Sequence, residues 1–281
     1  MKIKGDYHIH THNSCDDACL EFDFLAKALY MNSEVSLGIS DHLHSLIQEK
    51  DIAASRKEFD EFKAKFPQFR KRIHFGVEAS VMSQWELKKL NNIPEFSEYT
   101  YGIRKNGPAN ASMALSIDKE FIEKYKIEYV ISGVHWPLYC REDPLSMVKE
   151  YHREYLFAAS HPSTDILAHY LWWNPRKGMG NVFLNTRLIS NEMRDEIKCA
   201  LLENNAAFEV NIGAVLLNDD YKDNKAWLDW YLGWVHDIQN AGVKLSLGSD
   251  CHSEYLDPMW YKEAEKLFEH YKIDTEKFFT L

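Results

Sequence analysis

The sequence alternates between short apolar runs and longer stretches with helical periodicity, and this alternation constrains the fold more than any other feature. Apolar runs of this length are typical of buried strands. Strands that alternate with crossover helices form a parallel sheet. We predict strands at residues 7–12, 35–42, 72–80, 128–136, 165–170, 207–213 and 244–252. Helices are expected within residues 24–32, 53–66, 117–126, 145–159, 190–205 and 225–242.

We expect residues 1–281 to form a single domain. The length of the chain suits one large α/β barrel as well as two ordinary domains, but no stretch rich in Pro, Gly or Ser marks a linker. Hydrophobic residues make up 45% of the sequence, which is enough for a substantial core. Residues 84–108 are less regular than a simple crossover, and we interpret them as a helix and a loop that could cover a site.

Composition argues against several classes of protein. The formal net charge of −10 makes long nucleic acid a poor candidate partner, because binding to phosphate backbones depends on basic residues. The five cysteines are scattered without a Cys-x-x-Cys pair, so we expect reduced thiols and a cytoplasmic location. We find no apolar stretch with the length of a signal sequence or a membrane span, and we expect neither standard export nor a membrane partner.

Titratable side chains gather at the carboxyl ends of the predicted strands. In a βα barrel these ends meet on one face, so the side chains are expected to surround one small volume. A lone histidine at a strand end is more often a hydrogen-bonded structural residue. Burying this many titratable groups together without cations would be prohibitive, however, so the set predicts metal binding. Its members are His8, His10, Asp16, Asp41, His42, Glu78, His135, His169, Asp250 and His252, while the sixth strand carries Glu209 and Asn211.

Other residues near these positions are open to more than one interpretation. His12 and His44 lie beside candidate ligands in the sequence, and we expect them to contact the ligands from outside or to lie on the surface. Trp136 and Trp172 are as well suited to line a substrate pocket as to pack in the core. The helically spaced Trp227, Trp230 and Trp234 are expected in the core.

The motifs together resemble those of the polymerase and histidinol phosphatase (PHP) family of metal-dependent phosphoesterases. HIHTHNSCD resembles the first motif, SDHLHS the second, GVEAS and SGVHW the intermediate ones, LAHY the next and GSDCHS the last, in the same order and spacing. The resemblance implies an α/β fold, a distorted (β/α)7 barrel with two to three metal ions at the carboxyl ends of its strands. It also implies a small phosphorylated substrate.

Carried over by position, the resemblance implies a group of ligands for each ion. His8, His10, Glu78 and Asp250 would hold one ion, Glu78 as a bridge with His135 and His169 a second, and Asp16, His42 and His252 a third. Asp16 is preferred to Asp17 on spacing alone. Glu78, Asp250 and His252 are the candidate catalytic residues, and Asp6 and Asp41 are candidates to orient the ligating imidazoles.

Imidazole and carboxylate ligands suit Zn, Fe or Mn alike. Paired metal ions can generate a hydroxide that attacks phosphorus in line, so the leading hypothesis is hydrolysis of a phosphate monoester of a small metabolite, with histidinol phosphate as the first candidate. The segment AHYLWWNPRKG departs from the histidinol phosphatases, which leaves the substrate open; its Arg176 and Lys177 are candidate phosphate contacts. The alternatives are a phosphodiesterase acting on nucleotides or short oligonucleotides and a non-catalytic metal-binding module.

Overall fold

The computed structural model describes residues 2–90, 103, 106–174 and 179–281. Within these residues the strands follow the order β1-β2-β4-β6-β7-β8-β9, with β3 and β5 paired to β4. Neighbouring strands are parallel except β5, which runs antiparallel to β4. The strands are β1 (Gly5–Ile9), β2 (Ser36–Ile39), β3 (His42–Leu43), β4 (Ile73–Ser83), β5 (Met113–Leu115), β6 (Tyr129–Gly133), β7 (Ile166–Leu167), β8 (Ala207–Asn211) and β9 (Leu245–Gly248).

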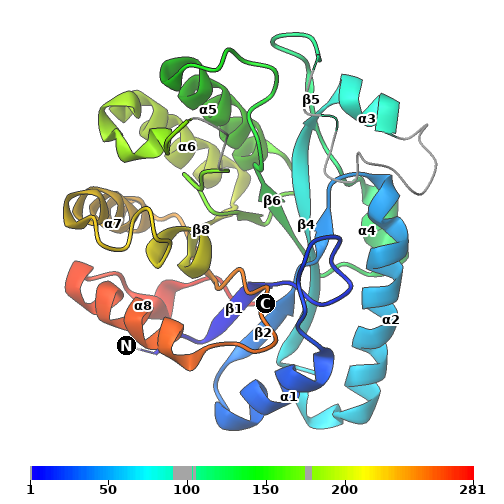
Figure 1. The fold of residues 1–281 in the computed structure, drawn as a ribbon. Coiled ribbons are helices and arrows are strands. Elements are labelled where there is room, and N and C mark those ends of the chain that lie inside the picture. The colour runs from blue at the N-terminus through cyan, green and yellow to red at the C-terminus, as the bar shows by residue number, and fades with distance from the viewer. Residues whose placement is uncertain (1, 91–102, 104–105, 175–178) are drawn as a thin grey trace.

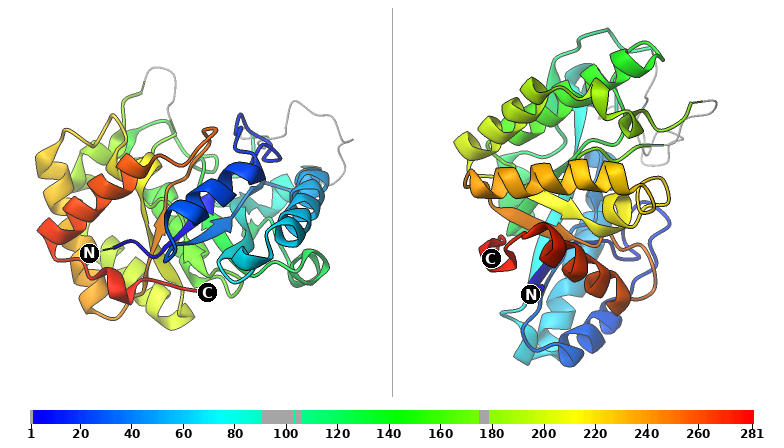
Figure 2. Two further views of the ribbon diagram at one scale, coloured as in Figure 1. Left: turned by 90° about the horizontal axis from the view of Figure 1, so that it is seen from below. Right: turned by 90° about the vertical axis from the view of Figure 1, so that its left-hand side faces the viewer.

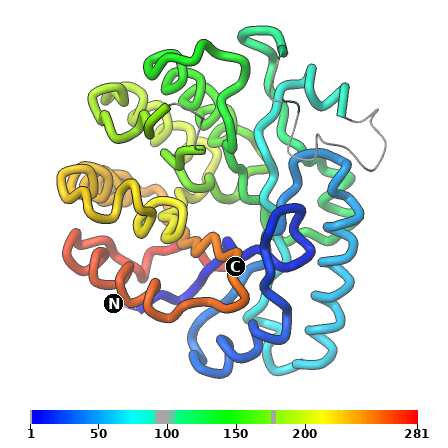
Figure 3. The backbone as a smooth tube through the Cα atoms, viewed as in Figure 1, coloured from blue at the N-terminus to red at the C-terminus, as the bar shows by residue number. Residues whose placement is uncertain are grey.

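The first and last strands lie side by side and nearly close the sheet (Figure 3). A parallel bridge joins Ile9 to Cys251, and the backbone N–H of Asp250 donates to the carbonyl of His8 at 2.8 Å. The result is an α/β barrel whose seven successive parallel strands fit the predicted (β/α)7 architecture. The carboxyl ends of these strands therefore face one side of the molecule.

Helices surround the sheet, with α1, α2 and α4 on one side and α5 to α8 on the other (Figure 1); two further views also place them outside the strands (Figure 2). They are α1 (Phe22–Met31), α2 (Glu49–Lys65), α3 (Gln84–Leu90), α4 (Lys119–Tyr125), α5 (Pro144–Ser160), α6 (Asn191–Asn204), α7 (Lys225–Asn240) and α8 (Pro258–Tyr271). Side-chain caps begin several of them. For example, Asp143 accepts from the N–H of Ser146 before α5, and Ser190 accepts from that of Met193 before α6.

The interior of the barrel is filled by aromatic side chains beneath the strand ends. The Tyr129 hydroxyl donates to the carbonyls of Tyr7 and Ile39, and its ring lies over Gly76, where an added Cβ would be 2.4 Å from it. Gly76 and Glu78 lie on the same face of β4, since side chains alternate along a strand. Tyr129 therefore closes the barrel below Glu78, and the candidate ligands lie above it at the carboxyl ends of the strands.

The structure differs from the predicted elements in several places, and helix α8 (Pro258–Tyr271) was not predicted. Strand β5 and a separate β3 were not predicted either, and β4 continues to Ser83, three residues beyond the predicted end, because its last residues pair with β5. In the irregular segment 84–108, helix α3 is confirmed; the expected loop falls largely on residues 91–102 and 104–105, which lie outside the described residues.

The sequence also led to expectations about the cysteines and about the hydropathy of the helices. Cys15, Cys19, Cys140, Cys199 and Cys251 form no disulfide among the described residues, while the cytoplasmic location inferred from them stays a prediction. Among the described residues, none of the helices combines the length and apolar character needed to cross a bilayer.

Candidate metal centre

The structure brings the predicted ligands together at the carboxyl ends of the strands. His8 belongs to β1, His42 to β3 and Glu78 to β4, and the others follow β1, β6, β7 and β9. They surround a cavity of about 450 Å³. Its lining includes Asp16, His42, Glu78, His135, His169, Asp250 and His252, and His8 and His10 are buried beside it.

Glu78 lies at the centre of this arrangement with no exposed side-chain surface. Its Oε2 atom faces one set of imidazole nitrogens and its Oε1 atom another. Oε2 lies 3.3 Å from His8, 3.5 Å from His10 and 2.8 Å from His42, while Oε1 lies 3.1 Å from His135 and 2.8 Å from His169. One carboxylate is thus shared between two groups of nitrogen atoms.

The group around Oε2 has the spacing of a tetrahedral site. His8 Nε2 and His10 Nε2 are 3.1 Å apart, and Asp250 Oδ1 lies 3.5 Å from the first and 3.2 Å from the second. Ligands held at 2.0–2.1 Å at the corners of a tetrahedron lie roughly 3.3 Å from one another. The ligand atoms of His8, His10 and Glu78 lie 3.1–3.5 Å apart and so have the spacing of ligands to one cation of the size of zinc, and Asp250 Oδ1 lies within 3.5 Å of both imidazoles.

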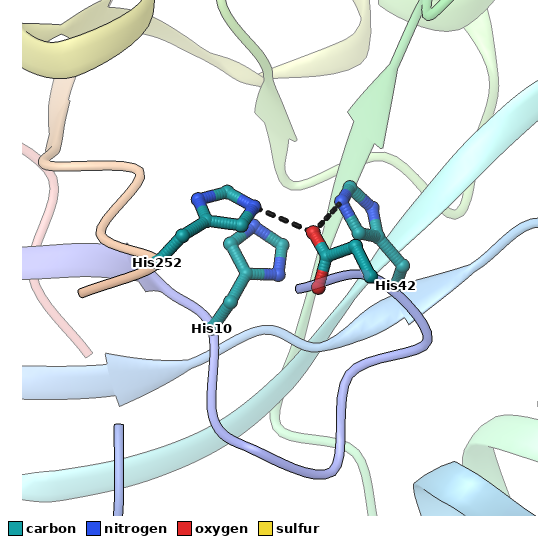
Figure 4. Close-up of side chains that lie close together, drawn as sticks. His10, His42 and His252 are labelled. Atoms are coloured by element: carbon teal, nitrogen blue, oxygen red, sulfur yellow. Dashed lines mark ion pairs between the residues drawn. The ribbon is translucent and has the colours of Figure 1, made fainter. Parts of the chain in front are cut away.

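A further group surrounds Asp16, whose Oδ2 atom lies 3.2 Å from His42 Nε2 and 2.6 Å from His252 Nε2. Figure 4 shows the rings of His42 and His252 paired to one carboxylate oxygen, with the His10 ring beside them. His10 lies 4.3 Å from each of these rings and shares their potential metal cluster. The ligand groups are therefore less separate than the resemblance implies. Asp17, the alternative to Asp16, is exposed.

Burial and mutual charge shift the pKa values of these groups in a way that favours cations. Burial alone would raise the pKa of Glu78, but the imidazoles of His135, His42 and His8 hold it well below its usual value. Burial and neighbouring imidazoles lower the pKa of His10 to about 3, and burial lowers that of His135 to about 4. Neutral imidazoles and ionised carboxylates are the forms that bind metal.

His8 and His42 behave differently. Burial opposes their charged forms, yet Glu209 and Asp250 raise the pKa of His8, and Glu78 and Asp16 raise that of His42 to about 10. Protons on these rings offset the same carboxylates that a metal ion would offset. Metal binding at this centre is therefore expected to release protons.

Two carboxylates expected to orient imidazoles bind other groups. Asp6 accepts from the N–H of Ser249 at 3.0 Å and from the hydroxyl of Tyr261 at 2.6 Å, and Asp41 accepts from the N–H and hydroxyl of Thr11 at 2.6 and 2.8 Å. Asp6 also accepts from the backbone N–H of His8 at 3.2 Å, so it contacts a candidate ligand through the backbone rather than through the ring. The two carboxylates fix the chain at the ends of β1 and β9, which positions the ligands through the backbone.

Glu209 is the residue beside His8 whose role was missed. Its Oε1 atom lies 2.7 Å from His8 Nδ1, and the side chain is buried. The sequence places Glu209 on the sixth predicted strand, but nothing in that pattern shows which ligand it faces.

A serine joins two more imidazoles. Ser80 Oγ lies 2.6 Å from His44 Nδ1 and 2.9 Å from His135 Nδ1. A hydroxyl has one hydrogen, so it donates to one ring and accepts from the other. His44 is buried in the cavity wall, whereas the His12 side chain is 39% exposed and pairs with Glu58. His44 thus contacts the candidate ligands from outside, and His12 lies on the surface.

The structure describes some of the candidate substrate contacts. Trp136 and Trp172 line the cavity. Trp227 and Trp234 are buried in the core, as expected, whereas Trp230 is only partly buried against it. Arg176 and Lys177 lie outside the described residues. The lining also includes Asn174, Asn218, Ser253 and Trp260, which were not predicted because no periodic pattern or motif position marks them in the sequence.

Comparisons with known proteins give a structural likeness. No family model matches the sequence, and no curated protein matches it. The structure is similar to a crystal structure of the histidinol phosphate phosphatase of Lactococcus lactis subsp. lactis Il1403, complexed with zinc, L-histidinol and phosphate. The TM-score is 0.61 and the identity 18%, over 98% of this chain and 95% of that chain. The two proteins therefore share a fold along nearly their whole lengths.

Proposed function

We propose that the protein is a metal-dependent phosphoric ester hydrolase that cleaves a phosphate monoester of a small metabolite. Residues 1–281 would act as a single domain holding two to three ions. The observation that carries the proposal is the Glu78 carboxylate, buried between two sets of imidazole nitrogens with one oxygen directed to each. A bridging carboxylate of this kind suits a site with two metals.

Buried polar atoms that make no ordinary hydrogen bond are a second reason to expect metal ions at this centre. Among the described residues, His42 Nδ1, His135 Nε2 and Glu78 Oε2 make no hydrogen bond of ordinary geometry. Yet His42 Nδ1 lies only 2.8 Å from Glu78 Oε2, and His135 Nε2 only 3.1 Å from Oε1. Buried polar atoms without hydrogen bonds are costly, and bound cations would satisfy all three. Zinc is the first candidate, since the neighbour is complexed with it, and Fe and Mn remain alternatives.

The candidate residues differ in whether they are suited to hold ions or to contact the substrate. When bound, such ions lower the pKa of water and stabilise charge on phosphoryl oxygens during in-line displacement. Glu78, with no exposed side-chain surface, is suited to holding ions. The side chains of Asp250 and His252 are 14% and 38% exposed and border the cavity. We propose that these two residues contact the substrate as well as the metal.

Histidinol phosphate is the first substrate to test. The neighbour's ligands, L-histidinol and phosphate, are the products of such a hydrolysis, and this chain shares its fold. Trp136 and Trp172 supply apolar walls for the organic part of a small substrate, and a cavity of about 450 Å³ is of the size that small-molecule sites have.

The test is metal analysis of the purified protein together with hydrolysis of a panel of phosphomonoesters and diesters. The proposal expects two to three ions per chain and cleavage that stops when the ions are chelated and resumes when zinc is restored. A protein that is free of metal, binds none and cleaves no ester would contradict it.

A matched pair of substrates decides between monoester and diester. We expect p-nitrophenyl phosphate to be cleaved with higher kcat/KM than bis-p-nitrophenyl phosphate, because a monoester carries an additional charge for the cationic centre. A tenfold preference for the diester, about 1.4 kcal/mol in transition-state stabilisation, would favour a phosphodiesterase.

A further inference from the structure

Glu209 makes contacts with candidate ligands that come from different strands. Its carboxylate is buried on β8, where Oε1 lies 2.7 Å from His8 Nδ1. Its Oε2 atom accepts from the backbone N–H of His169 at 2.6 Å and from Asn211 Nδ2 at 3.0 Å. Asn211 Nδ2 also lies 3.3 Å from Asp250 Oδ2. Glu209 and Asn211 thus link the ends of β1, β7 and β9.

The chemistry of a carboxylate determines what its partners must present. Ionised, it has lone pairs and no hydrogen, so each partner must donate. In the neutral ring that binds a metal ion, His8 therefore carries its hydrogen on Nδ1, which leaves the Nε2 lone pair for the side where His10 Nε2 and Glu78 Oε2 lie, at 3.1 and 3.3 Å. An imidazole ligand is commonly fixed in this way by a second hydrogen bond.

We propose that Glu209 is a positioning residue that sets His8 in the tautomer needed for metal binding and couples it to the backbone of His169. The inference rests on the proposed metal-dependent function. His8 belongs to the group around Glu78 Oε2 and His169 to the group around Oε1. One carboxylate therefore organises ligands of both groups, and its loss weakens both together.

The surrounding structure is built around this carboxylate. Gly248 on β9 leaves the space that it occupies, because an added Cβ there would lie 1.9 Å from Glu209 Oε1 and 2.6 Å from His8 Cβ. His169 has a φ of 25°, outside the favoured regions for an L residue, and its N–H is the group that Glu209 holds. The contact thus stabilises a strained turn that presents a candidate ligand.

Substitution of Glu209 by Gln exchanges one oxygen for a donor at nearly constant volume. Two donors, His169 N and Asn211 Nδ2, already point at the Oε2 position. The amide oxygen of Gln belongs there, which places its NH₂ group against His8 Nδ1. His8 must then accept on Nδ1 and carry hydrogen on Nε2, where it can no longer bind a metal ion.

The matched control is Glu128→Gln. Glu128 Oε2 lies 2.9 Å from His74 Nδ1, and its Oε1 accepts from the N–H of Phe75 at 3.3 Å. The pair therefore repeats the Glu209 arrangement, a carboxylate on an imidazole and a backbone N–H, at the start of β4 rather than beside the site. It separates loss of a carboxylate–imidazole contact from loss of this particular one.

The experiment measures the zinc affinity and the His8 tautomer of full-length parent, E209Q and E128Q. Zinc dissociation constants come from competition with a chelator. The hydrogen on His8 Nδ1 is detected in long-range ¹H–¹⁵N spectra of [¹⁵N]histidine-labelled protein, with His8 assigned from its missing signals in H8N. We expect a 10- to 100-fold weaker zinc affinity in E209Q and an unprotonated Nδ1. E128Q should match the parent in both.

Each result bears on a distinct claim. A parent in which Nδ1 carries no hydrogen overturns the inference without any variant. An E209Q protein that keeps the Nδ1 hydrogen, or the parent's zinc affinity, also overturns it. A parent that binds no zinc but shows the change of tautomer in E209Q contradicts the metal-dependent function and leaves the control of His8 by Glu209 standing.

Discussion

Two glycines leave space for buried carboxylates in the candidate metal centre. An added Cβ at Gly133 would lie 2.4 Å from Glu78 Oε1, and one at Gly248 would lie 1.9 Å from Glu209 Oε1. Both glycines are in strands, where glycine is otherwise unfavourable. Close approach of a buried carboxylate explains their presence better than backbone freedom does.

Glu78 is the residue whose loss should matter most. In Glu78→Gln the shared carboxylate disappears, so we expect the metal content to fall by at least one ion per chain and hydrolysis to fall by more than 100-fold. His12→Ala, which removes a partly exposed neighbour, should keep at least half of the parent activity. Elemental analysis and kcat/KM on p-nitrophenyl phosphate measure both. Equal losses in the two variants would show that the ligands are wrongly assigned.

The glycine contact can be tested apart from Glu209 itself. Gly248→Ala should displace the Glu209 carboxylate, lower the stability by about 1–3 kcal/mol through overpacking and weaken zinc binding roughly tenfold or more. Gly233→Ala is the control, because nothing lies within 4 Å of an added Cβ in that position of α7. Alanine there should be neutral or stabilising by up to about 1 kcal/mol. Urea unfolding and chelator competition distinguish these outcomes; similar behaviour of both variants would contradict the argument.

The candidate metal ligands can be recognised in the sequence. The contacts and backbone angles that position each of them cannot. His, Asp and Glu at strand ends can be recognised because parallel strands bring their carboxyl ends together. The positive φ values of His169 and Asp250, 25° and 55°, have no counterpart in the sequence pattern. The partner of Glu209 could not be predicted either, since it depends on the space at Gly248 on the neighbouring strand.

Among the elements, helix α5 anchors the loop that carries His135. Glu154 on α5 is fully buried, and its Oε1 atom accepts from the N–H of Leu138 at 2.8 Å. Burial raises the pKa of Glu154 well above its ordinary value, and the negative charge of the neighbouring Glu150 acts in the same direction. The carboxyl therefore keeps its proton in the folded protein at a pH at which the unfolded chain has lost it.

This shift predicts a pH-dependent effect of Glu154→Gln. As the pH rises above about 4.5, folding of the parent requires uptake of a proton by Glu154, so its stability falls; the variant has no such requirement. We expect the stability of the variant relative to the parent to grow between pH 5 and pH 8, by up to about 1.4 kcal/mol per pH unit. Urea unfolding at both pH values measures it, with exposed Glu203→Gln as the control. A difference that does not change with pH would refute the argument.

The elements themselves were largely predictable. All of the predicted strand segments contain a strand of the barrel, and Gly242, with a φ of 102°, follows α7 as a helix stop should. The predicted strand 35–42 is divided in the structure into β2 and the separate β3 (His42–Leu43), and β5 (Met113–Leu115) was missed. Strands β3 and β5 form only by pairing with β4, a long-range contact that local sequence does not reveal.

For the whole molecule, removal of metal should lower the thermal stability. An ion that binds only the folded chain stabilises it by about 4 kcal/mol at a free concentration 1,000-fold above its Kd. For a chain of this size we expect a decrease in Tm of roughly 5–15 °C on chelation. Calorimetry with zinc and with chelator tests this, and Glu78→Gln should show a smaller difference. An unchanged Tm in the parent would mean that the centre does not bind metal in the folded state.

The meeting of β1 and β9 also sets the order in which the centre can be completed during synthesis. His8 leaves the ribosome about 240 residues before Asp250, and its neighbour in the sheet is the strand made last. At about 5–20 residues per second, roughly 10–50 s pass between them. Throughout that interval the early histidines belong to an unfinished barrel. The group of candidate ligands that includes Asp250 and His252 comes together only when β9 takes its place beside β1.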